Sequence, residues 1–98
     1  MAFPQVAAEN GGNQATNVLS HTVNLPDGSD TIGHRVIVIF GVDQAPAVTW
    51  PSGWTPVAAA SNVTNCRLEI RERIIDGSEG YPGTGATITL TTDSIQMS

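Results

Sequence analysis

Apolar and polar side chains alternate in several short segments of this chain, and this period of two predicts β-strands with one buried and one solvated face. In residues 19–25 the apolar side consists of Leu19, His21, Val23 and Leu25. In residues 86–92 it consists of Ala86, Ile88 and Leu90, which alternate with three threonines. Both segments are therefore expected to contribute to the core.

Residues 34–42 are apolar on both faces, because the run from Val36 to Ile39 is β-branched throughout and Phe40 follows it. Antiparallel strands commonly expose one face to water, so a strand with two apolar faces needs a second cover. That cover is either more of this chain or another subunit. The pattern leaves open which face of the strand lies in the core.

Residues 66–75 form the fourth expected core strand, and its two faces differ in polarity. One face carries Cys66, Leu68, Ile70 and Ile74 together with Glu72. The other face carries Arg67, Glu69, Arg71 and Arg73. We expect this charged face to be solvated or paired across strands. Cys66, the only cysteine, is expected to be a small buried hydrophobe rather than a reactive thiol.

Turn residues separate these segments at intervals typical of all-β proteins. Residues 47–50 form a short strand, residues 51–53 a turn, and residues 54–60 a return strand in which Pro56 favours an edge position. Together the pattern predicts an antiparallel β-sandwich or a jelly-roll-like fold, with residues 1–98 as a single domain. Residues 3–8 are a candidate additional strand.

The alternation of apolar and polar residues resumes close to Ser98, where Ile95 and Met97 alternate with polar neighbours. A strand that starts there allows two interpretations. The domain is truncated at its C-terminus, so that residues 1–98 are the N-terminal part of a longer domain, or a neighbouring molecule supplies the missing strand.

Charge narrows the range of partners. The chain has four arginines, no lysine and nine acidic residues, for a net charge of −5. Nucleic-acid binding needs surplus positive charge, so we expect neither nucleic acid nor an anionic membrane as a partner. No apolar run is long enough to span a membrane, and the first twelve residues lack the pattern of a signal peptide. Synthesis in a cytoplasm is therefore expected.

Four segments also carry a resemblance to a known family. They are Thr22-Val23-Asn24-Leu25-Pro26, Thr49-Trp50-Pro51-Ser52-Gly53-Trp54-Thr55, the strand that starts at Arg67-Leu68 and ends in Asp76-Gly77-Ser78-Glu79-Gly80, and Ala86-Thr87-Ile88-Thr89-Leu90-Thr91. Together they resemble a β-rich domain of bacteriophage tail and virion structural proteins, an uncharacterised family of environmental phages. The resemblance implies a structural role in a virion, after synthesis in the host cytoplasm, and it brings no catalytic residues. Glu72 departs from the family pattern, which has an aromatic residue there.

The resemblance and the doubly apolar strand favour assembly through protein–protein contacts, as a homo-oligomer or with other virion proteins. The candidate interface residues are Ile37, Ile39, Trp50 and Trp54. An alternative is a carbohydrate- or receptor-binding module that recognises a host surface glycan. Its candidate residues are Trp50, Trp54, Asn62 and Asn65. Because large apolar residues are scarce, the more economical interpretation is that the two tryptophans cover the core.

No residue pattern points to catalysis, so we predict that the protein is not an enzyme and uses no cofactor or metal. Ser52 lacks the G-x-S-x-G context of a nucleophile elbow. His21 and His34 have no third ligand at zinc spacing. Asp76 and Glu79 lie in a loop whose acidic residues are better explained by turn chemistry than by calcium binding.

Overall fold

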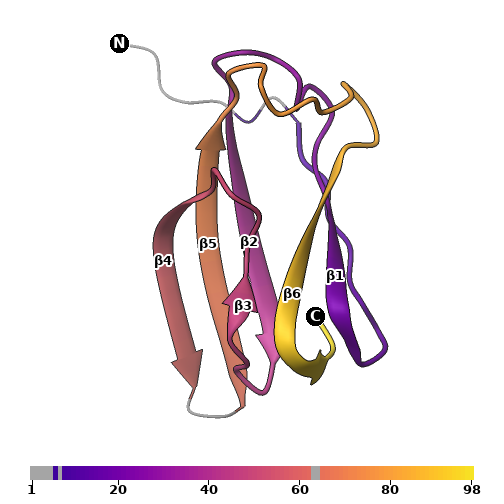
Figure 1. Cartoon of the computed structure of the whole chain (residues 1–98), viewed down its shortest axis with the longest axis vertical. Coiled ribbons are helices and arrows are strands. Elements are labelled where there is room, and N and C mark those ends of the chain that lie inside the picture. Colours follow the sequence, from indigo (N-terminus) through magenta and orange to yellow (C-terminus); the bar gives the residue numbers. More distant parts are fainter. Residues whose placement is uncertain (1–5, 7, 63–64) are drawn as a thin grey trace.

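In the part of the chain that the structure describes, six β-strands form two antiparallel three-stranded sheets (Figure 1). The computed structural model describes residue 6, residues 8–62 and residues 65–98. The strands are β1 (Val18–Asn24), β2 (Arg35–Asp43), β3 (Val48–Thr49), β4 (Thr55–Asn62), β5 (Cys66–Ile74) and β6 (Thr87–Gln96). The described residues contain no helix that could cross a membrane. Most of the strand predicted for residues 3–8 lies outside the described residues.

The order of strands is β1-β6-β3 in one sheet and β2-β5-β4 in the other. Only β4 and β5 follow one another within a sheet, and each other connection passes to the opposite sheet. Strand β4 lies at an edge, as Pro56 predicted, because proline cannot donate a main-chain hydrogen bond on a second side. The predicted all-β architecture is thus confirmed.

The core lies where alternate residues of the two sheets meet. Strand β2 buries Val36, Val38, Phe40 and Val42, and β6 contributes Ile88 and Leu90. His21 of β1 packs against Phe40 with its ring edge-to-face, at 5.4 Å between ring centroids. The sequence pattern of residues 34–42 left open which face of β2 lies in the core. The buried face is the one that carries Phe40.

His21 is buried and joins β1 to the end of β6. The Thr92 hydroxyl donates to the carbonyl oxygen of Ser94, so its oxygen accepts a hydrogen bond from His21 Nε2 at 3.3 Å. His21 Nδ1 then accepts a hydrogen bond from the Ser98 hydroxyl at 2.7 Å. This arrangement requires the neutral ring. Burial lowers the pKa of His21 below its ordinary value, and a hydrogen bond with the Val18 backbone raises it by a smaller amount.

Two details at the ends of strands differ from the sequence prediction. Residues 95 and 97 begin no separate strand, because β6 continues to Gln96. The register between β1 and β6 is interrupted between Val18 and Ser20, where Val18 lies opposite Gln96 but Ser20 lies opposite Thr91. This irregularity buries Gln96 and leaves Leu19 exposed, against the prediction that Leu19 faces the core.

The central position of Leu90 provides a test of the core. Leu90 is fully buried, so we expect Leu90→Ala to lower the free energy of unfolding by about 2–5 kcal/mol. Thr89→Ala, at the next and exposed position of β6, should cost less than about 1 kcal/mol. Urea denaturation measures both. Equal losses would contradict the assigned faces of β6.

The environment of His21 predicts a dependence of stability on pH. Because its folded-state pKa is lowered, the stabilisation is present above the unfolded-state pKa of about 6.5 and is lost as pH falls through the folded-state pKa. The urea midpoint of the native protein should therefore fall when pH is lowered from about 7 to about 5. This fall should be smaller in His21→Gln and unchanged in His34→Gln, which alters an exposed ring. An unchanged fall in His21→Gln would contradict the assignment.

Candidate assembly surface

Among the described residues, the outer face of the β2-β5-β4 sheet is apolar and largely exposed. Ile37 and Ile39 of β2 are 57% and 67% exposed, and Leu68 of β5 is 42% exposed. The register places Ile39 beside Ile70, and Ile70 beside Ala58 of β4. Leu68 likewise lies beside Gly41 and Ala60. We call this set the outer apolar face: Ile37, Ile39, Gly41, Leu68, Ile70, Ala58 and Ala60.

This face results from an inversion of β5 relative to the sequence prediction. Phe40 points into the core, and the register pairs Phe40 with Glu69, so the charged side of β5 also points inward. The sequence predicts this side to be solvated or paired across strands; Glu69 is not solvated, since it is 5% exposed, and it is paired with Trp50 instead. The expectation that Cys66 is buried is wrong. The period of two then forces the apolar side of β5 outward, because neighbouring residues point to opposite faces.

Glu69 is tolerated inside because its carboxylate is satisfied on several sides. Oε1 accepts a hydrogen bond from Trp50 Nε1 at 2.9 Å. Oε2 accepts one from Arg67 Nε at 2.7 Å, and Arg71 Nη2 lies 3.7 Å from Oε1. The guanidinium of Arg71 also stacks over the Trp50 ring, 5.2 Å from its centroid. A buried carboxylate without such partners would be strongly destabilising.

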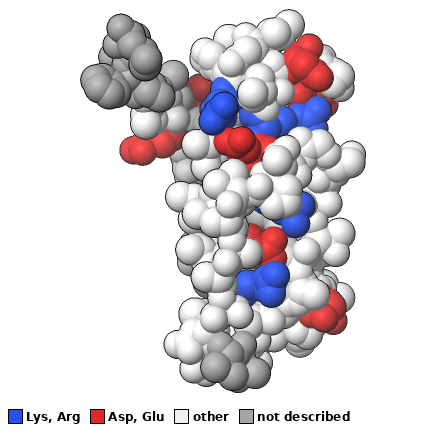
Figure 2. Space-filling model, turned by 90° about the vertical axis from the view of Figure 1, so that its left-hand side faces the viewer, with Lys and Arg blue, Asp and Glu red and all other residues white. Residues whose placement is uncertain are grey.

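A third arginine, Arg73, fixes the turn between β3 and β4. Arg73 Nε donates to Glu79 Oε2 at 2.7 Å, and Arg73 Nη1 donates to the carbonyl oxygen of Ser52 at 3.1 Å. Gly53 has φ of +91°, and a Cβ there would meet the guanidinium of Arg73. The backbone conformation therefore favours glycine in the Trp50–Trp54 segment, and a larger residue would also have to displace Arg73 from its hydrogen bonds. Figure 2 shows the arginines and acidic residues in patches along the long axis, among uncharged surface.

Both tryptophans belong to the core. Trp50 and Trp54 are 9% and 5% exposed, and their ring centroids are 6.2 Å apart. Neither ring offers the exposed face that stacking on a sugar would need. Asn62 and Asn65 are exposed, but Asn62 ends β4 whereas Trp54 precedes it, so the strand separates them. The structure therefore does not bring the four candidate sugar-binding residues together.

Ile37 and Ile39 are the two candidate interface residues that the structure leaves exposed, and Trp50 and Trp54 lie beneath the opposite face of the same sheet. Sequence reasoning missed the contribution of β5 and β4 to this surface, which consists of Leu68, Ile70, Ala58 and Ala60. The available signal was the alternation in β5 itself. Its interpretation depended on the register with β2, which the alternation does not specify.

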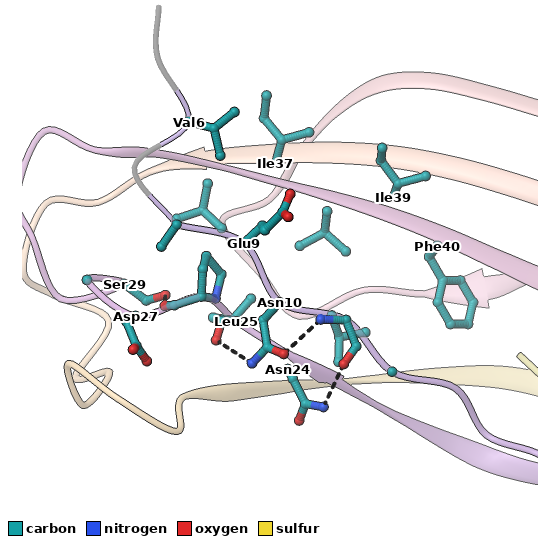
Figure 3. Close-up of a pocket in the computed structure, with 18 of the residues that line it drawn as sticks. Val6, Glu9, Asn10, Asn24, Leu25, Asp27, Ser29, Ile37, Ile39 and Phe40 are labelled. Carbon is teal, nitrogen blue, oxygen red and sulfur yellow. Dashed lines mark hydrogen bonds between the residues drawn. The ribbon is translucent and has the colours of Figure 1, made fainter.

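A groove of about 750 Å³ runs along the free edge of β2 (Figure 3). Residues 34–41 line one side, and residues 8–13 and 22–29 line the other. Figure 3 shows Ile37 and Ile39 on one side of β2 and Phe40 on the other. The groove thus reaches from the edge of the outer apolar face towards the core.

The acidic loop residues engage their own loop. Asp76 Oδ1 accepts hydrogen bonds from the backbone and the hydroxyl of Ser78, at 2.9 Å and 2.6 Å. Glu79 accepts hydrogen bonds from the backbone N–H groups of Asp76 and Gly77. Within the described ranges, no three histidine, cysteine or acidic side chains come together as a metal site.

Comparisons with known proteins add no family. No protein-family model matches the chain, and neither a curated protein nor a solved structure matches it.

The role of Glu69 predicts a measurable difference between the two faces of β5. Glu69→Ala should lower the free energy of unfolding by about 2–3 kcal/mol, because it leaves Trp50 Nε1 and two arginines without their acceptor. The loss of stability should be smaller than for a fully buried pair, because the Arg67 and Arg71 side chains remain 33% and 27% exposed. Urea denaturation is the measurement.

Glu72→Ala is the matched control on the outer face. Glu72 pairs with Arg35 at 3.4 Å, and the Arg35 side chain is 58% exposed, so its loss should cost less than about 1 kcal/mol. A larger effect for Glu72→Ala than for Glu69→Ala would contradict the inward orientation of Glu69.

Proposed function

We propose that this chain is a structural module of a bacteriophage particle, with a β-sandwich or jelly-roll-like fold, and that it assembles with further copies of itself. The observation that carries the proposal is the outer apolar face, where isoleucine and leucine side chains face solvent while Glu69 is buried beneath the same sheet. The proposal includes no catalytic step, cofactor or metal.

The energetics favour covering this face. Full burial of an isoleucine or leucine side chain is worth about 1.5–3 kcal/mol, and three such side chains on this face are more than two-fifths exposed. Contiguous exposed apolar patches on soluble proteins commonly mark interfaces. The central rows of the face carry no charge, since Ile39, Ile70 and Ala58 share one row and Gly41, Leu68 and Ala60 the next.

Other features support a virion setting. The resemblance of the Thr22–Pro26, Thr49–Thr55 and Ala86–Thr91 segments to phage virion proteins supplies the expected location. Pairing of buried side chains from two antiparallel sheets supports the sandwich, whose connections pass mainly between sheets. A second copy is the proposed partner because each copy carries the same uncovered face, and like apolar faces complement one another in closed symmetric assemblies.

The proposal predicts self-association that depends on the outer apolar face. Size-exclusion chromatography with light scattering, across a concentration series, should show a defined oligomer for the native protein. Ile39→Lys should weaken association by at least about tenfold, because each interface would bury a charge without a partner. Thr89→Lys is the control, since Thr89 is exposed on the outer side of β6.

A monomer at the highest soluble concentration would contradict the proposed self-assembly. Equal weakening by Ile39→Lys and Thr89→Lys would contradict the location of the interface. Circular dichroism of both variants establishes that a loss of association is not a loss of fold.

A further inference from the structure

We propose that two copies of this chain pair through the free edge of β2, antiparallel across a two-fold axis at Ile39, so that their sheets join into one six-stranded sheet. This inference rests on the proposed self-assembly, and it names the segment and the register through which the first contact forms.

The main-chain groups of alternate β2 residues point away from β5. In an antiparallel strand the N–H and C=O of one residue point to the same side, and successive residues alternate. Ile75 N–H donates to His34 C=O, and Gln44 N–H donates to Asn65 C=O. The main-chain N–H and C=O groups of the even-numbered residues therefore point towards β5. Asp43 N–H instead donates to Met97 C=O, away from β5. The outward groups therefore belong to Arg35, Ile37, Ile39, Gly41 and Asp43.

Four of these residues have no main-chain partner on the outward side within the described residues, and Asp43 is the exception. They are Arg35, Ile37, Ile39 and Gly41. Unpaired main-chain groups in a long apolar edge strand form a template for another strand. The edge is therefore both apolar in its side chains and unsatisfied in its backbone.

The opposite edge of the same sheet is protected, and β2 is not. Strand β4 carries Pro56 and an irregular register between Pro56 and Ala58, which are two features that block pairing. Strand β2 has neither proline nor bulge between Arg35 and Asp43, and it pairs with β5 without interruption. This contrast selects β2 as the edge that accepts a second strand.

The groove leaves space beside β2 for this pairing. The segment across the groove is tied to the β1 side: Asn10 Nδ2 donates to Leu25 C=O, and Asn24 Nδ2 donates to Gly11 C=O (Figure 3). Farther along, Gln14 and Ser98 exchange two main-chain hydrogen bonds. These contacts do not use the outward groups of β2. Met97 C=O does occupy the outward N–H of Asp43, so the main chain of an added strand pairs with β2 only from Ile37 to Gly41.

The sequence of β2 is complementary to itself in one antiparallel register. With the axis at Ile39, each Arg35 lies opposite Asp43 of the second copy, and each Ile37 lies opposite Gly41. The charges at both ends are then opposite, and the glycine leaves room for the isoleucine. The outward groups from Ile37 to Gly41 would form about six main-chain hydrogen bonds. The two outer apolar faces become continuous, since both sheets keep the same side outward.

Disulfide trapping tests the register. In a Cys66→Ser background, Ile39→Cys should form a covalent dimer under mild oxidation, because paired residues across an antiparallel ladder have Cα atoms about 5.5 Å apart, within disulfide reach. Ile37→Cys is the matched control, because it alters another exposed isoleucine on the same face. Its two copies would be four residues apart along the paired strands, about 13 Å, which is too far for a disulfide.

Charge reversal tests the ends of the same register. Arg35→Asp places two acids together at each end, and Asp43→Arg places two arginines there, so each change should weaken association by at least about tenfold. The double variant Arg35→Asp with Asp43→Arg restores opposite charges, and it should associate within about threefold of the native protein.

The outcomes separate this inference from the proposed function. Dimer trapping at Ile39→Cys together with rescue by the double charge variant supports edge pairing. Association that Ile39→Lys abolishes, but with equal trapping at both cysteine positions or without charge rescue, overturns edge pairing and leaves assembly through the outer apolar face. A native protein that remains monomeric overturns both.

Discussion

The structure depends on the burial of one carboxylate beneath a tryptophan. Glu69 accepts a hydrogen bond from Trp50 and contacts Arg67 and Arg71, and this group holds the charged side of β5 inward. Burial of charge is costly and is tolerated only when its partners are well placed. The arrangement fixes the register of β5 against β2, and a shift by one residue would exchange its two faces.

The inversion of β5 connects the core to the surface. Because the inward side is charged, the outward side must present Cys66, Leu68 and Ile70, and β2 adds Ile37 and Ile39 beside them. A single chain thus has a polar group at its centre and an apolar sheet face in water. In the proposed assembly a second copy covers that face, and the proposed pairing along the edge of β2 adds a second sheet beside the first.

The sequence predicted the strands better than it predicted their orientation. Alternation located β1, β2, β5 and β6, and Pro56 correctly placed β4 at an edge, because these signals are local. Cys66 and Glu69 were placed on the wrong sides because the orientation of β5 depends on partners distant in sequence, chiefly Trp50. Ile37 and Ile39 were recognised as needing a cover, whereas the free edge of β2 depends on strand order, which alternation does not reveal.

The reactivity of Cys66 tests this account most directly, because it is the only thiol and lies on the outward side of β5. In dilute, folded protein the account predicts that a maleimide reagent labels Cys66 at nearly the rate measured in urea, and more slowly as concentration rises and copies assemble. Slow labelling of the dilute folded protein, at all concentrations, would place Cys66 inside and contradict the inward burial of Glu69.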